Sequence, residues 1–208
     1  MHTLHIETSV HGRVLHEDRG ADRLLVGFHG YAETAEVHLE ELRKIPGIEN
    51  WSLAAVQALH PFYTRSGQIV ASWMTSLDRE LAIRDNLAYV HKVLGSLPRP
   101  GMLVYLGFSQ GAAMAARAAA YASPPSGLIL LGGDIPPEVK SDPNVTLPPV
   151  LFARGVNDDW LSREKFKNDL SYLESKTRVT TCEFEGGHEW TDPFREAAAA
   201  FLDDVALL

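Results

Sequence analysis

The sequence contains a single cysteine, Cys182, among its 208 residues. One thiol cannot form a disulfide within the chain, or a CxxC site for a metal or for redox chemistry. Long apolar runs are also missing, since no stretch approaches the roughly 18 residues that a membrane span needs. The first residues carry His, Glu and Asp where a signal peptide would be apolar. We therefore expect a cytoplasmic protein without a membrane span.

Positive charge is scarce as well. The chain has 19 Lys and Arg against 27 Asp and Glu, a net charge of −8 with His neutral. An acidic excess without a basic cluster disfavours binding to phosphate backbones, so nucleic acid is not expected as a partner. With 45% hydrophobic and 22% charged residues, the composition is that of a folded globular protein. The length predicts a single domain over residues 1–208.

Motifs that bind metals or nucleotide cofactors are absent from the sequence. It contains no HExxH zinc motif, no GxxxxGK[ST] phosphate-binding loop and no GxGxxG dinucleotide motif. The nine histidines form no cluster at metal-ligand spacing. The sequence therefore predicts no cofactor and no required metal.

What is present is a regular alternation of short apolar runs and longer helical patterns. The apolar runs predict strands at residues 24–28, 51–56, 102–106, 128–131, 150–153 and 179–184. Helical periodicity predicts helices at about residues 33–45, 78–94, 110–122, 163–173 and 193–204. Near the N-terminus, residues 4–6 and 13–16 suggest an antiparallel hairpin. The alternation indicates an α/β fold, a mostly parallel central sheet with helices on both faces, and ligand sites at the carboxyl ends of the strands.

A candidate nucleophile lies between a predicted strand and a predicted helix, where residues 107–111 read GFSQG. In such a GxSxG turn the serine, here Ser109, adopts a strained conformation that exposes its hydroxyl, and the positions two before and two after it must be small. Gly107 and Gly111 satisfy that requirement. The N-terminus of the following helix would favour negative charge that develops beside Ser109.

Two later strands are each followed by a residue that can complete a catalytic triad. Asp158 follows one of them, and His188 follows the other behind two glycines. The order Ser, Asp, His along the chain is that of α/β-hydrolases. In this chemistry the imidazole takes the serine proton and the carboxylate orients the imidazole. Asp158 is the preferred acid from its place in the loop, and Asp159 and Asp134 remain alternatives.

The predicted strand at residues 24–28 runs into the sequence His29-Gly30-Tyr31. A backbone N–H from this loop, paired with the N–H of the residue after the nucleophile, would form an oxyanion hole. We assign these two donors to the backbone of Tyr31 and Gln110.

Large apolar side chains gather in the long segment after the strand at 51–56 and once more near the C-terminus. They could line an acyl or alcohol pocket, and the candidates are Phe62, Tyr63, Trp73, Met74 and Trp190. The alternative reading, in which these side chains pack loops onto the core, is equally favoured for any one of them.

Four short blocks of the sequence, taken together, carry a family resemblance. They are FHG at 28–30, GFSQG at 107–111, GVND at 155–158 and GHE at 187–189. In these blocks the chain resembles the phospholipase/carboxylesterase family of α/β-hydrolases, which includes acyl-protein thioesterase-like serine esterases. The resemblance extends from about residue 22 to the C-terminus.

The resemblance implies an α/β-hydrolase fold with Ser109, Asp158 and His188 as the catalytic triad. It also implies Tyr31 and Gln110 as the oxyanion donors. The activity it implies is hydrolysis of a small-molecule acyl ester or thioester, without a cofactor and with a homodimer in some members.

The chain departs from the family pattern at a few positions. Many members carry Gly and Asp where Ala32 and Glu33 stand, and Phe or Tyr where Met74 stands. Residues 132–149, between two predicted strands, are too few for a large cap domain. We therefore expect an open site suited to small or medium acyl groups.

Other functions remain open on the residues alone. A protein of this fold can be a non-catalytic ligand-binding protein, although no member of the triad is missing here. A triad does not separate ester from amide hydrolysis, so a small serine peptidase is a further alternative. A dienelactone-hydrolase-like enzyme is disfavoured because it would carry cysteine at position 109, where this chain has serine.

Overall fold

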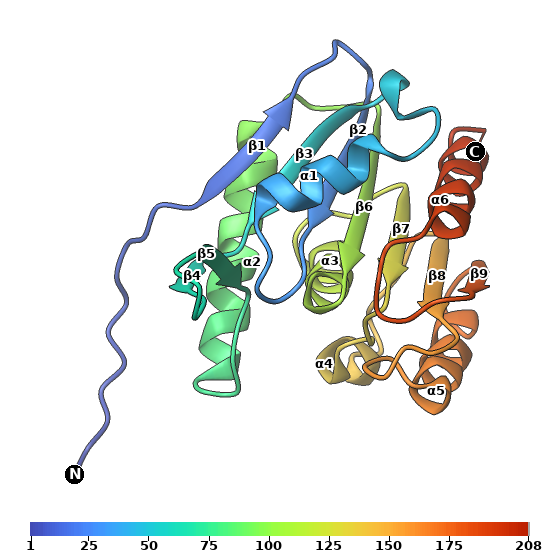
Figure 1. The fold of residues 1–208 in the computed structure, drawn as a ribbon. Helices are drawn as coiled ribbons and strands as arrows, with labels where there is room; N and C mark the ends of the chain where they lie inside the picture. Colours follow the sequence, from blue (N-terminus) through green and yellow to red (C-terminus); the bar gives the residue numbers. More distant parts are fainter. Residues whose placement is uncertain (208) are drawn as a thin grey trace.

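The computed structural model describes residues 1–207 and shows a central sheet with helices on both faces (Figure 1). Within these residues, one sheet contains seven strands in the order β1-β3-β2-β6-β7-β8-β9. Their bounds are β1 Arg13–Glu17, β2 Arg23–Phe28, β3 Ser52–Gln57, β6 Met102–Phe108, β7 Gly127–Leu131, β8 Val150–Gly155 and β9 Val179–Phe184. β1 runs antiparallel to β3, and all other neighbours in this sheet are parallel.

The central strands coincide with the apolar runs of the sequence because both of their faces are covered. β7 and β8 are buried along their whole length, and β2 is buried apart from its first residue. Successive side chains alternate between two core clusters: Leu24 and Val26 pack on one face of the sheet, and Leu25 packs on the other. Each large apolar side chain buried in this way stabilises the fold by about 1.5–3 kcal/mol.

Two groups of helices cover the two faces of the sheet. α1 (Ala35–Arg43) and α6 (Asp192–Val205) pack on one face. α2 (Arg79–Ser96), α3 (Gln110–Tyr121) and α5 (Arg163–Glu174) contribute to the core on the other. The predicted strands and helices at these places are confirmed, with ends shifted by a few residues. In the part of the chain that the structure describes, no helix is long and apolar enough to cross a membrane.

The predicted N-terminal hairpin is wrong. Residues 4–6 form no strand, and their side chains are exposed. β1 instead pairs antiparallel with β3, with Arg13 opposite Gln57. β3 offers the edge of a sheet that is already packed against helices, whereas an isolated hairpin of two short strands is marginal in water.

Two short elements near β3 lie where the sequence pattern indicates only loops. A 3₁₀ turn, η1 (Ile48–Asn50), precedes β3. After β3, β4 (His60–Tyr63) and β5 (Ile69–Ser72) form a separate two-stranded antiparallel hairpin. Its turn contains Gly67 at φ +82°, a left-handed conformation that glycine adopts without strain.

The segment between β7 and β8 contains the short helix α4 (Pro137–Ser141). Its residue Glu138 accepts hydrogen bonds from the guanidinium groups of Arg117 in α3 and Arg79 in α2. These charge-assisted bonds fasten the segment to the body of the protein. Within residues 1–207, no cap domain rises from this segment over the carboxyl edge of the sheet.

Candidate active site

Ser109 lies at the sharp turn between β6 and α3. Its backbone has φ 56° and ψ −121°, a conformation that residues other than glycine rarely adopt, and its N–H donates to the Leu131 carbonyl at 2.8 Å. A Cβ at Gly107 would lie 2.2 Å from the Gly111 carbonyl oxygen, and a Cβ at Gly111 would lie 1.9 Å from the Phe28 carbonyl oxygen. Close backbone approach therefore requires both glycines, as the GxSxG spacing predicts.

His188 connects Ser109 to Asp158. Its Nε2 lies 2.8 Å from Ser109 Oγ, and its Nδ1 lies 2.9 Å from Asp158 Oδ2. A carboxylate only accepts hydrogen bonds, so Nδ1 carries the hydrogen and Nε2 is left to accept from the serine hydroxyl. The Asp158 side chain is 1% exposed, and its Oδ1 accepts from the backbone N–H groups of Trp160 and Leu161 at 2.8 and 2.9 Å. The carboxylate is thus fixed from both oxygens.

The geometry distinguishes Asp158 from the two alternative acids. Asp159 is exposed on the surface. Asp134 is exposed as well and lies on the wall of the same cavity as His188, but the imidazole bonds to Asp158. Of the three carboxylates, only Asp158 is placed to orient the base.

Glycines bring the acid loop and the base loop together. Gly155 ends β8 and lies so near the His188 loop that a Cβ on it would be 2.2 Å from the Gly187 carbonyl oxygen. Gly132 follows β7 with φ +62°, and a Cβ there would lie 3.1 Å from the His188 ring and 3.2 Å from Asp158 Oδ2. A larger residue at either place would separate the two loops.

The two residues assigned as oxyanion donors lie at the same cavity as Ser109. Tyr31 and Gln110 both contribute to its wall. Gln110 is the first residue of α3, so its N–H has no acceptor within the helix and is available to a ligand. This placement is compatible with an oxyanion hole, and the role itself remains a prediction.

The loop that carries Tyr31 is fixed on both sides. The Gly30 N–H donates to Glu33 Oε2 at 2.7 Å, and the Ala32 N–H donates to the Ala71 carbonyl at 3.0 Å. Ala32 has φ +58°, where many relatives of the resembled family carry glycine. Burial raises the pKa of the Glu33 carboxyl, and the hydrogen bond from Gly30 partly offsets this. Although Ala32 and Glu33 depart from the family pattern, the loop is still fixed by hydrogen bonds.

His29 precedes this loop and holds it to the segment after β3 by hydrogen bonds. It is fully buried, and burial lowers its pKa because the cation would lose its hydration. Its Nε2 accepts from the Ala58 N–H at 3.0 Å, so its Nδ1 carries the hydrogen and donates to the Gly30 carbonyl at 2.7 Å. The Trp73 indole N–H donates to the His29 carbonyl at 2.8 Å.

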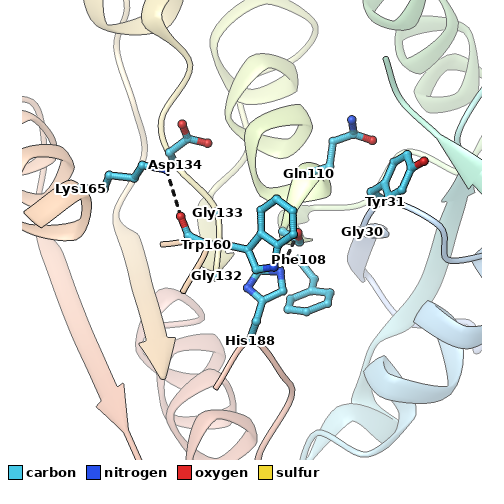
Figure 2. A pocket seen from close by; sticks show the side chains of 11 residues that line it. Gly30, Tyr31, Phe108, Gln110, Gly132, Gly133, Asp134, Trp160, Lys165 and His188 are labelled. Carbon is cyan, nitrogen blue, oxygen red and sulfur yellow. Dashed lines mark hydrogen bonds between the residues drawn. The ribbon is translucent and has the colours of Figure 1, made fainter. Parts of the chain in front are cut away.

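Beside Ser109 and His188 is a cavity of about 530 Å³. Figure 2 shows the rings of His188, Phe108 and Trp160 in its middle, Tyr31 and Gln110 on one side, and Asp134 and Lys165 on the other. Its wall consists of Gly30, Tyr31, Phe108, Ser109, Gln110, Gly132, Gly133, Asp134, Trp160, Lys165 and His188. Among residues 1–207, no group of three or more His, Cys, Asp or Glu side chains is arranged to hold a metal ion.

Several solved structures have the same fold as this chain. No family model and no curated protein sequence matches this chain. An esterase designated PE8 superposes on it with a TM-score of 0.76 at 22% identity, covering 93% of this chain and 98% of that one. The Zea mays acyl-protein thioesterase 2 gives 0.72 at 18%, covering 94% and 99%, and the Bacillus cereus carboxylesterase gives 0.71 at 18%, covering 93% and 94%. The chain has the α/β-hydrolase fold.

Two of the predicted pocket residues belong to the core of this α/β-hydrolase fold and not to the cavity wall. Trp73 is fully buried, and Met74 is 8% exposed. The Gln110 side chain holds their backbone: its Oε1 accepts from the Trp73 N–H at 2.9 Å, and its Nε2 donates to the Met74 carbonyl at 2.8 Å. Neither residue belongs to the cavity wall, and both are held by the residue that follows the nucleophile.

The other three predicted pocket residues also lie outside the wall as far as residues 1–207 define it. Trp190 packs edge-on against His38, with ring centroids 5.4 Å apart. Phe62, in the β4–β5 hairpin, stacks against the Tyr31 ring with ring centroids 5.4 Å apart. Tyr63 is 73% exposed. Packing of loops onto the core is therefore the better description of four of these five side chains, Tyr63 being the exception.

The wall instead contains residues that the sequence analysis did not single out. Phe108 occupies the variable position before the nucleophile, and its ring lies 4.9 Å from that of His188. Trp160 and Lys165 follow Asp158 closely in the chain. Their nearness to the predicted acid is a signal that could have identified them, because the loop after a catalytic acid lies at the same edge of the sheet.

Proposed function

We propose that the chain is a serine carboxylesterase and thioesterase that acts on small to medium acyl groups. The observation that carries this proposal is the continuous relay from Ser109 through His188 to Asp158, with contacts of 2.8 and 2.9 Å at the wall of a cavity. A serine hydroxyl becomes an effective nucleophile only when an adjacent base can take its proton. The intact relay also disfavours the alternative of a non-catalytic binding protein.

In the proposed reaction, Ser109 Oγ forms a bond to the acyl carbon while its proton moves to His188 Nε2. Asp158 stabilises the resulting imidazolium. The carbonyl oxygen becomes an anion, which the backbone N–H groups of Tyr31 and Gln110 would bind. His188 then gives the proton to the leaving oxygen or sulfur as its bond to the acyl carbon breaks. Water, activated by the same imidazole, releases the acid and restores Ser109.

The substrate class follows from the cavity and from the similar structures. A cavity of about 530 Å³ suits a small or medium ligand, and the segment over residues 132–149 forms only the short helix α4 above the body of the protein. The similar proteins are named an esterase, a carboxylesterase and an acyl-protein thioesterase. These names support ester and thioester hydrolysis over the alternative of a small serine peptidase.

The proposal is tested by covalent labelling and hydrolysis together. A fluorophosphonate should label the wild-type chain at Ser109 alone, and Ser109→Ala should remain folded by circular dichroism but lose hydrolysis by several powers of ten. Rates on 4-nitrophenyl esters from acetate to palmitate, and on matched thioesters, should rise to about butanoate or octanoate and then level off. Labelling elsewhere, or cleavage of peptides without cleavage of esters, would contradict the proposal.

Further expectations accompany this function: a single catalytic domain over residues 1–208, a cytoplasmic location and self-association into a homodimer. Cell fractionation tests the location, and analytical ultracentrifugation at several protein concentrations tests the association. A monomer at every concentration would remove the homodimer from the proposal and leave the activity unaffected.

A further inference from the structure

One side of the cavity carries a positive charge that the triad does not use. Lys165 lies in the first turn of α5, on the cavity wall next to Trp160. Its Nζ donates to the Trp160 carbonyl at 3.1 Å, a contact drawn in Figure 2. An ammonium group has three N–H donors. Across residues 1–207 this is the one hydrogen bond that the ammonium makes, and it forms no ion pair.

The chemistry of the relay tells which part of a substrate this wall would face. His188 must hand its proton to the leaving atom, so the leaving group lies on the imidazole side of the scissile carbonyl. The oxyanion points the other way, toward Tyr31 and Gln110. The Trp160 ring lies 6.1 Å from the His188 ring. The wall formed by Trp160 and Lys165 is therefore beside the leaving group.

We infer that Lys165 makes this site selective for esters and thioesters whose leaving group carries a carboxylate. The inference rests on the proposed hydrolase function and specifies its substrate. An ammonium held by a backbone carbonyl beside the departing atom can donate its remaining N–H groups to a carboxylate oxygen, and charge-assisted bonds of this kind are the strong ones. The apolar ring of Trp160 would cover the chain between the ester bond and that carboxylate.

The negative charge of Asp134 favours a ligand with one negative charge over a ligand with two. It lies on the same wall and is exposed, but Figure 2 shows its carboxylate directed away from His188. A leaving group with a single carboxylate would meet less repulsion from Asp134 at Lys165 than one with two negative charges. A phosphate dianion would meet the repulsion of Asp134, and a cationic leaving group would have to pass the ammonium of Lys165.

The expected selectivity is modest because the ammonium is exposed to water. Exposed pairs of opposite charge contribute little free energy, which corresponds to about a 1.5-fold to fivefold preference in kcat/KM. The preference should decline as salt is added. Asp134→Asn should increase the preference, since it removes the neighbouring negative charge.

The experiment compares butanoyl thioesters of mercaptoacetate, 3-mercaptopropanoate and 4-mercaptobutanoate with those of the corresponding neutral amides. Thiol release gives kcat/KM for each, and the ratio of anionic to neutral substrate is the readout. In Lys165→Met this ratio should fall about 1.5-fold to fivefold relative to wild type, whatever the change in the rate on the neutral thioesters. Comparing this ratio between each variant and wild type cancels the difference in intrinsic reactivity between the anionic and neutral thioesters.

Lys167→Met is the matched control, because Lys167 is exposed on the same helix and does not belong to the cavity wall. It removes the same charge and should leave the ratio unchanged. An equal fall in both variants, or no fall in Lys165→Met, would overturn the inference. So would a wild-type preference for butanoylthiocholine, whose leaving group is cationic.

A final substrate pair tests whether Lys165 lies on the leaving-group side or on the acyl side of the scissile bond. In 4-nitrophenyl hemisuccinate the carboxylate is on the acyl part, and 4-nitrophenyl butanoate is its neutral partner. Their ratio should not respond to Lys165→Met, and a larger response here than with the mercaptoalkanoates would place Lys165 on the acyl side and overturn the assignment. Absence of all thioester and ester hydrolysis would instead refute the proposed function, so the two failures can be told apart.

Discussion

The side-chain amide oxygen of Gln110 accepts a hydrogen bond from the backbone N–H of Trp73 at 2.9 Å. Gln110 immediately follows the nucleophile, and the indole of Trp73 in turn donates to the His29 carbonyl at 2.8 Å, two residues before Tyr31. Trp73 therefore links the two loops that carry the proposed oxyanion donors. Its backbone N–H binds one loop and its indole N–H binds the other.

This link predicts that Trp73→Phe will lower kcat by about tenfold with little change in KM, because loss of the indole hydrogen bond would displace the proposed oxyanion donors. Steady-state kinetics on a short 4-nitrophenyl ester measures the effect. Trp51→Phe is the control, since Trp51 is also buried but lies in the core cluster on the opposite face of the sheet from Trp73. Equal kinetic effects in the two variants would show that the link has no role.

Asp158→Asn should reduce turnover by about 10⁴ with little change in structure, because an amide in this place favours the wrong imidazole tautomer. Asp159→Asn should have a far smaller effect, since Asp159 is exposed and makes no contact with the imidazole. Both variants are compared by kcat on the same ester and by thermal unfolding. A larger loss in Asp159→Asn would exclude Asp158 as the acid.

Gly132→Ala should cost both stability and activity. The alanine would be strained at φ +62°, at about 1 kcal/mol, and its Cβ would press on the His188 ring at 3.1 Å. Displacement of the imidazole should lower kcat/KM by about 10- to 100-fold. Gly20→Ala separates the two effects, because Gly20 has φ +66° but nothing within 4 Å of its Cβ position. It should lose similar stability, measured by urea unfolding, and keep full activity.

Acid should destabilise the fold in part through His38. Burial lowers the pKa of His38 from 6.5 to about 3, so the folded state binds fewer protons than the unfolded state between these values. The contribution of His38 is then fully present above pH 6.5 and is lost as the pH falls toward 3. Over that window the slope is about 1.4 kcal/mol per pH unit.

The measurement is the free energy of unfolding in urea between pH 6 and 4.5. His38→Asn removes the titrating group, so its unfolding free energy should fall less steeply with acid than that of wild type, whatever its stability at neutral pH. His91→Asn is the control because His91 is exposed, and it should keep the wild-type slope. An unchanged slope in His38→Asn would mean that this imidazole does not titrate below its ordinary range.

Much of the fold was predictable because its information is local. Strands such as β7 and β8 are buried on both faces, so they appear in the sequence as unbroken apolar runs. The GFSQG turn was predictable for the same reason: the glycines at 107 and 111 are required by contacts within the turn and with the adjoining strand. The relay could be anticipated because each of its residues follows its own strand, and parallel strands end at one edge of the sheet.

The cavity wall was decided by tertiary packing. Trp73 and Trp190 are residues of a type that often lines ligand pockets. Contacts with segments distant in sequence bury Trp73 completely and cover much of Trp190, and no local sequence pattern records those contacts. The same holds for β1, whose partner is the edge of β3 and not its neighbour in the chain. The sequence by itself determined where most strands and helices lie along the chain and which residues form the relay, because both depend on local periodicity and spacing. Only the tertiary structure decided that Trp160, Lys165 and Asp134 line the cavity, because loop conformations are set by long-range packing.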